Sequence, residues 1–186
     1  MHTLSSSIWI TSIVLTASLL YQPVTNSADS DNRCIFLKNE QTAALVAADW
    51  ENLERLAGGY VDECKGNFEP QDLSSAHENI AIANNELGRY NRGLAAAEAC
   101  IKVHYGNSGC HILKAEALIA LVQYTQARKA LDISEKLARR ALVDAKHDRD
   151  RAGSEPYKEL YSAKVNLYES QLYRISEMKS RVRGNH

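Results

Sequence analysis

The sequence has few residues that interrupt helices. It contains three prolines and nine glycines among 186 residues, and its aromatic residues are mostly tyrosine. Alanine and leucine are frequent, and together with Glu, Lys and Arg they have the highest helix propensities. A chain of this length can form one domain with a substantial buried core. The composition therefore favours a mainly helical domain.

The chain also lacks an excess of charge of either sign. It has 22 basic and 23 acidic residues, for a formal net charge of −1, so nothing indicates bulk attraction to nucleic acid or to an anionic membrane surface. Signatures of catalysis are missing too: we find no His-Glu-x-x-His, no Gly-x-Ser-x-Gly, no phosphate-binding glycine loop and no dinucleotide fingerprint. We expect a protein that is not an enzyme, with no cofactor and no nucleic-acid partner.

No Asp, Glu, Lys or Arg precedes Asp29. The apolar run Ile8–Leu20 lies in this uncharged segment, and its thirteen residues are too few for a comfortable transmembrane helix. We interpret residues 1–28 as a signal peptide, cleaved after Ser27 or Ala28. Because His2 and the α-amino group replace the usual Lys or Arg, an uncleaved membrane anchor is the alternative. The prediction is an exported protein, periplasmic or secreted, in which an even number of cysteines suggests disulfides.

A repeat with a period of 34 residues runs through the middle of the chain. Shifting the sequence by 34 positions gives seven identities, most at apolar sites with helical spacing: His77/His111, Ala81/Ala115, Ala83/Ala117, Leu87/Leu121, Tyr90/Tyr124, Ala96/Ala130 and Lys102/Lys136. A weaker unit lies upstream in "AALVAADWENLERLAGGY", where Trp50 precedes Tyr90 by 40 residues. An insertion between the two is placed in "CKGNFEPQD", residues 64–72.

These segments resemble tetratricopeptide repeat (TPR) proteins, whose unit is a 34-residue helix–turn–helix. "AIANNELGRYNRGLAAAEAC" carries the family's glycine, tyrosine and small residue as Gly88, Tyr90 and Gly93, whereas the next copy has Val122 in place of the glycine. The resemblance implies an all-α fold, a short right-handed α-solenoid of about three helical hairpins. We assign it to residues 29–146.

Residues 147–186 are expected to form a long C-terminal capping helix. Ser154 and Pro156 form a helix start after the charged run "KHDRDRAG". One apolar stripe follows along the predicted helix, at Tyr161, Val165, Tyr168, Leu172 and Ile175. The stripe fits a cap on the open end of the solenoid, with a coiled-coil dimerisation seam as the alternative.

The resemblance also implies a binding groove. In TPR proteins the first helix of each unit lines the concave face, which here gives the partner-binding candidates Glu78, Ile82, Asn85, Glu86, Ile112, Glu116 and Ile119. This mixture of apolar and acidic residues suits a basic or amphipathic helical segment of another protein. The leading hypothesis is an exported adaptor, and the alternative is a periplasmic chaperone or assembly factor for a secretion or pilus client.

The four cysteines can be placed on the same repeat geometry. Cys34 and Cys64 fall at adjacent ends of one hairpin, and Cys100 and Cys110 flank the turn between two hairpins, so the pairing 34–64 and 100–110 is favoured. Zinc at Cys100, His104, Cys110 and His111 is the weaker alternative, because the spacing does not match structural zinc motifs. We predict no metal, and a metal- or thiol-dependent activity at Cys100–His111 is the lowest-ranked hypothesis.

Overall fold

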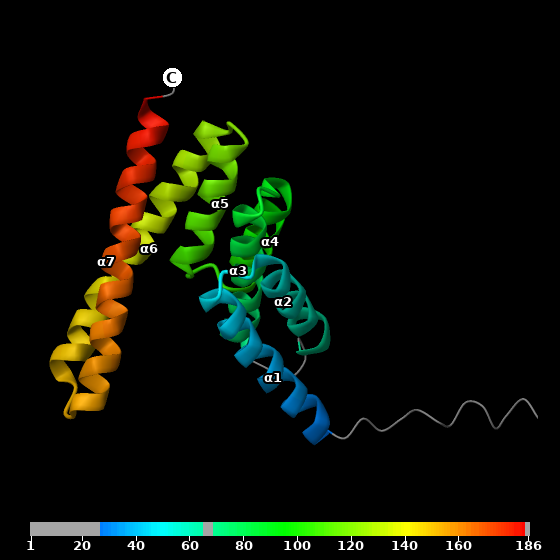
Figure 1. The fold of residues 1–186 in the computed structure, drawn as a ribbon. Helices are drawn as coiled ribbons and strands as arrows, with labels where there is room; N and C mark the ends of the chain where they lie inside the picture. The colour runs from blue at the N-terminus through cyan, green and yellow to red at the C-terminus, as the bar shows by residue number, and fades with distance from the viewer. Residues whose placement is uncertain (1–26, 65–68, 185–186) are drawn as a thin grey trace, which may run out of the picture.

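The fold is all-α, as the sequence predicts. The computed structural model describes residues 27–64 and 69–184, and within these ranges it contains seven helices and no strand. Consecutive helices fold back on one another as hairpins that stack along the chain (Figure 1). The helices are α1 (Ser27–Val46), α2 (Trp50–Cys64), α3 (Pro70–Glu86), α4 (Tyr90–Val103), α5 (Ser108–Ala120), α6 (Tyr124–Arg151) and α7 (Glu155–Arg183).

The hairpins α1–α2, α3–α4 and α5–α6 are closed by the same turn. The second residue after the first helix of each hairpin has a left-handed backbone, with φ of 54° at Ala48, 71° at Gly88 and 61° at Val122. The next N–H then donates to a carbonyl five residues back, over 2.7–3.0 Å, in the pairs Asp49–Ala44, Arg89–Asn84 and Gln123–Leu118. This is the Schellman ending of a helix. Its recurrence confirms the three predicted hairpins.

The core is divided into successive clusters along the stack. The first joins α1, α2 and α3 through residues such as Leu37, Leu53 and Tyr60, and the second joins α3, α4 and α5 around Ala81, Ala97 and Leu113. The third lies between α5, α6 and α7 and contains Ile112, Leu118, Leu131, Ile175, Met178 and Val182. Each hairpin thus buries its apolar residues against its neighbours, which is the arrangement of a solenoid.

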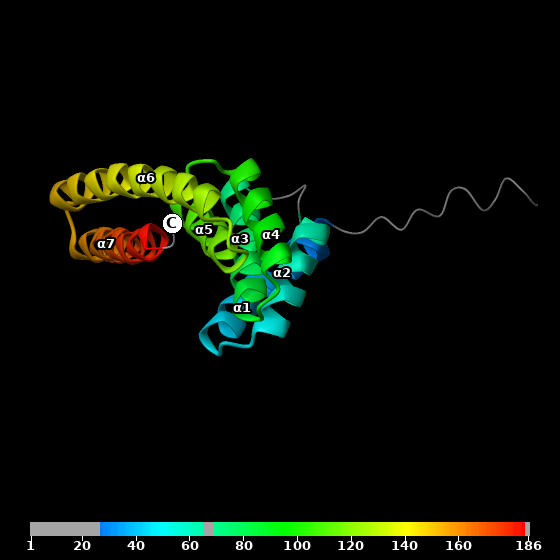
Figure 2. The same cartoon turned by 90° about the horizontal axis from the view of Figure 1, so that it is seen from above.

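Helices α6 and α7 form a long antiparallel pair at the C-terminal end (Figure 2). Residue 146, where the repeat domain was expected to end, lies inside α6, which continues through the charged run to Arg151. Ser154 is the N-cap residue of α7 and Pro156 lies in its first turn, although the serine side chain makes no capping hydrogen bond. Because Ile175, Met178 and Val182 are buried against α5 and α6, the second half of α7 covers the end of the stack.

Two sequence predictions fall largely outside the described residues. The predicted signal peptide covers residues 1–28, of which only the last two are described, as the start of α1. The predicted insertion spans the connection from α2 to α3, where residues 65–68 are not described. No helix in the described ranges combines the length and the apolar character needed to cross a bilayer.

Candidate functional site

All seven predicted groove residues lie on α3 and α5 and line two neighbouring hollows. The smaller hollow, about 190 Å³, is lined by Glu78, Ile82 and Ile112 among others. The larger hollow, about 510 Å³, is lined by Asn85, Glu86, Glu116 and Ile119 together with Tyr90, Ala120 and Tyr124. The α3 and α5 faces that were assigned to a groove from the repeat register therefore border these two hollows.

The second wall of both hollows comes from α7, which sequence reasoning did not assign to the groove. Ser170 lines the smaller hollow, and five further α7 residues line one hollow or the other: Leu167, Gln171, Arg174, Met178 and Arg181. They follow one another at intervals of four, three, four and three residues, which places them on one stripe of the helix. That spacing was readable in the sequence, but only the packing of α7 on α6 shows which way the stripe faces.

Polar contacts hold α7 against α5 across this groove. The Ser108 hydroxyl donates a hydrogen bond to Gln171 Oε1 over 2.7 Å, and the Arg174 guanidinium forms an ion pair with the Glu116 carboxylate. Ser108 begins α5 and Glu116 lies in its second half. The two contacts therefore join the α5 wall to the α7 wall at two separate places.

Burial shifts the pKa values of two groove carboxyls. Burial raises the pKa of Glu78, partly offset by the Asn107 amide hydrogen bond and by the Arg174 charge. Burial likewise raises the pKa of Glu116, against the opposing effect of its ion pair with Arg174. Arg174 and Arg181 enter from α7, so the groove carries both signs of charge in addition to apolar surface.

The seven candidates differ in how accessible they are. Ile112 is only 1% exposed and belongs to the core cluster. The Asn85 amide donates to the Leu113 carbonyl over 3.1 Å, and a Cβ at position 93 would lie 2.0 Å from its Oδ1. Gly93 therefore makes room for Asn85, and both residues act in helix packing. Glu86 is exposed, and Ile82 and Ile119 are half-buried.

The four cysteines form two disulfides in the pairing that the repeat geometry favoured. Cys34–Cys64 links α1 to the last residue of α2, with Cα atoms 5.9 Å apart. Cys100–Cys110 links α4 to the first turn of α5, with Cα atoms 6.0 Å apart. These Cα separations are usual for disulfides.

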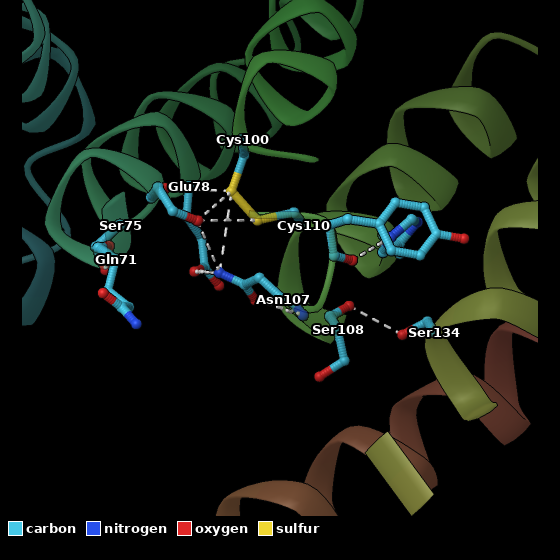
Figure 3. Close-up of a disulfide and its surroundings, with 12 residues drawn as sticks. Gln71, Ser75, Glu78, Cys100, Asn107, Ser108, Cys110 and Ser134 are labelled. Atoms are coloured by element: carbon cyan, nitrogen blue, oxygen red, sulfur yellow. Dashed lines mark hydrogen bonds between the residues drawn. A yellow bond between two sulfur atoms is a disulfide. The ribbon is translucent and has the colours of Figure 1, made fainter. Parts of the chain in front are cut away.

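The Cys100–Cys110 bridge lies beside the carboxylate of the half-buried Glu78 (Figure 3). A carboxylate oxygen of Glu78 and the two sulfur atoms all lie within 4.8 Å of one another. Asn107 Nδ2 donates to Glu78 Oε2 over 2.9 Å, and the Ser74 hydroxyl lies 3.2 Å from Cys100 Sγ. No sequence motif indicates this grouping, because Glu78 is 22 residues from Cys100.

Neither histidine of the sequence-based zinc alternative belongs to this group. His111 Nε2 instead lies 3.1 Å from the Tyr105 carbonyl, and the two rings meet edge to face. His104 is the C-cap residue of α4. The histidines at this joint therefore have structural contacts of their own.

The comparisons with known proteins agree with this fold. No protein-family model matches the sequence, and no curated protein is significantly similar to it. A solved structure described as the TPR2B-domain:pHsp70-complex of yeast Sti1 superposes with a TM-score of 0.53 at 18% identity, covering 78% of this chain and 97% of that one. A likeness at this identity shows the fold alone: the chain is a TPR-like all-α solenoid.

Proposed function

We propose that the chain is a non-catalytic adaptor that binds a segment of another protein in the groove between α3, α5 and α7. The observation that carries this proposal is the groove itself, in which every residue chosen from the repeat register lines one of two adjoining hollows. The similar solved structure is itself described as a complex of a TPR domain with pHsp70. Protein binding is the role that such a fold supports in general.

The groove chemistry favours an amphipathic helical segment as the ligand. The half-buried Ile82 and Ile119 and the exposed Leu167 offer apolar contact along the groove. Glu86 on one wall and Arg181 on the other offer charges of opposite sign. A helix with an apolar stripe flanked by charged residues meets both requirements.

We further propose that this adaptor is exported to the periplasm or secreted. The uncharged segment before Asp29 supports this, and so do two disulfides in a chain with four cysteines. Mass spectrometry of the protein from its native compartment tests the proposal. We expect an N-terminus at or next to Ala28 or Asp29, and an intact Met1 in a cytosolic fraction would contradict export.

A charge reversal inside the groove tests the adaptor function. A partner crosslinked to the wild type is first mapped to a segment, and its affinity is then measured as a purified peptide. Glu86→Lys should weaken this affinity at least tenfold, because it replaces an exposed groove carboxylate with a cation. Glu51→Lys reverses an exposed charge on α2, away from both hollows, and should leave the affinity unchanged. Equal affinities for the three proteins would refute binding in the groove.

One feature favours a second function, a chaperone or assembly factor that holds an apolar client. Tyr157, Leu160 and Leu167 of α7 are 61%, 50% and 51% exposed, and their spacing places them on the stripe that lines the smaller hollow. Exposed apolar surface of this kind suits reversible binding of unfolded segments. The test compares the wild type with Tyr157→Ser/Leu160→Ser in suppressing the aggregation of a client protein. If the variant loses this suppression but keeps its affinity for the peptide, the result supports the chaperone function over the adaptor.

A further inference from the structure

One carboxylate and the two cysteine side chains of a disulfide, from three different helices, converge at the joint between α4 and α5. Glu78 comes from the middle of α3, Cys100 from the last turn of α4 and Cys110 from the first turn of α5. Their donor atoms lie within 4.8 Å of one another. Within residues 27–64 and 69–184, this is the one group of three or more His, Cys, Asp or Glu side chains found close enough to share an ion.

A helix N-terminus and an amide group lie beside these donors. Cys110 is the third residue of α5, at the end of the helix whose dipole attracts negative charge. Asn107, the N-cap residue of the same helix, donates to Glu78 and fixes the orientation of its carboxylate. Such an outer hydrogen bond is what orients a ligating carboxylate in metal sites.

Gly109 allows the carboxylate to approach this closely. A Cβ at position 109 would lie 2.3 Å from Glu78 Oε1, which no side chain could tolerate without displacing Glu78. Gly109 and Glu78 also line the smaller hollow. Cys100 and Cys110 are 0% exposed, so an ion cannot reach the sulfur atoms directly from the surface. The smaller hollow provides an entry route on the side of the Glu78 carboxylate.

We propose that a thiol reductant converts the Cys100–Cys110 disulfide into a site for one thiophilic divalent cation of the Zn²⁺ class, bound by Cys100 Sγ, Cys110 Sγ and the Glu78 carboxylate. Two thiolates and one carboxylate are donors that Zn²⁺ accepts, and water from the hollow completes a tetrahedral set. The disulfide takes two electrons and two protons from two reductant thiols, which leave as their own disulfide. The cation then displaces both cysteine protons to solvent.

This site would keep the α4–α5 joint crosslinked in either redox state. The disulfide closes the joint when the protein is oxidised, and the metal closes it when the protein is reduced. The inference does not depend on a partner in the groove. A failure of the metal test therefore leaves the adaptor proposal unaffected.

The test uses the Cys34→Ala/Cys64→Ala protein, in which Cys100 and Cys110 are the remaining cysteines. It is reduced with a phosphine under anaerobic conditions and titrated with Co²⁺. We expect one equivalent to bind, with thiolate-to-cobalt charge transfer in the near ultraviolet and intense d–d bands of tetrahedral Co²⁺ in the visible, both abolished by Zn²⁺. The oxidised protein should show neither.

Two further variants decide the ligand set. Glu78→Gln keeps a hydrogen-bond acceptor for Asn107 but loses the anionic ligand, and it should weaken Co²⁺ binding at least tenfold. Cys100→Ser/Cys110→Ser should abolish the charge-transfer band. No thiolate band in the reduced protein, or equal affinity in Glu78→Gln, would overturn the proposal. If reduction lowers the far-UV helical signal, Zn²⁺ should restore it, and failure to restore it would also count against the site.

Discussion

At the scale of single residues, Val122 occupies a backbone conformation that suits glycine. Its φ is 61°, and at the equivalent place one repeat earlier the chain has Gly88 at 71°. A β-branched residue is strained in this region, whereas glycine adopts it freely. We expect Val122→Gly to raise the free energy of unfolding by about 1 kcal/mol, the strain relief exceeding the added unfolded-state entropy. Urea denaturation measures this change.

Val143→Gly is a matched control for this prediction. Val143 has the same exposed fraction as Val122, 67%, but it lies inside α6. Glycine there should lower the free energy of unfolding by about 0.5–1 kcal/mol, because it reduces helix propensity without relieving strain. A Val122→Gly protein that is destabilised as much as Val143→Gly would contradict the role assigned to the turn.

The buried His111 should make the fold sensitive to acid. Burial lowers the pKa of His111 below its usual 6.5, against a smaller opposing effect of the hydrogen bond to the Tyr105 carbonyl. Below about pH 6.5 the unfolded chain then binds more protons than the folded chain, so this residue's contribution to stability is lost as the pH falls. Glu78 and Glu116, whose pKa values are raised, change stability in the opposite direction.

The His111→Gln variant isolates the histidine from these carboxyls. The glutamine amide can still donate to the Tyr105 carbonyl, but it does not titrate. We expect the wild type to lose stability relative to His111→Gln between about pH 7.5 and 5.5, as followed by urea denaturation. A stability difference that stays constant over this range would mean that His111 is not protonated differently in the folded and unfolded chains.

At the scale of helices, the repeated hairpins and the start of α7 could be predicted, but the end of α6 could not. The 34-residue spacing of small and large apolar residues recurs because each hairpin packs on the next in the same way, as at Ala81 and Ala115, both 0% exposed. The charged run after Lys146 contains no residue that stops a helix before Gly153, and the helix continues to Arg151. Local propensity there outweighed the polarity that suggested a boundary.

The packing of α1 depends more on the Cys34–Cys64 disulfide than the packing of α4 and α5 depends on the Cys100–Cys110 disulfide. As the first helix of the stack, it packs mainly on α2, and its ion pairs Arg33–Glu63 and Lys38–Asp72 are largely exposed. Exposed ion pairs add little stability, whereas a disulfide that closes about 30 residues adds about 3–4 kcal/mol by restricting the unfolded chain.

We therefore expect Cys34→Ala/Cys64→Ala to expose α1 selectively. Hydrogen exchange should become faster by at least tenfold for amides of α1, and remain unchanged for those of α5. Cys100→Ala/Cys110→Ala, which removes the other disulfide, should leave exchange in α1 unchanged. Uniformly faster exchange in both helices would show that α1 unfolds only with the whole molecule.

At the scale of the whole molecule, the groove could be predicted only in part. The repeat register placed Glu86 and Ile119 on its α3 and α5 wall, because helix periodicity decides which side chains share a face. The α7 wall, with Arg174 and Met178, depends on how a terminal helix of 29 residues lies on α6. The approach of Glu78 to Cys100 and Cys110 could not be predicted either, since three separate helices bring these residues together.

The packing of Ile175 gives a final prediction, which separates a capping role of α7 from a dimerisation seam. Ile175 is 1% exposed and packs in the cluster shared by α5, α6 and α7, whereas Leu167 on the same helix is 51% exposed. If α7 packs on the solenoid of its own chain, Ile175→Ala should lower the free energy of unfolding by about 2–5 kcal/mol. Leu167→Ala should lower it by less than about 1 kcal/mol.

The melting temperature of the wild-type protein should also not change with protein concentration. A melting temperature that rises with concentration and a large loss in Leu167→Ala would instead assign α7 to an interface between two chains.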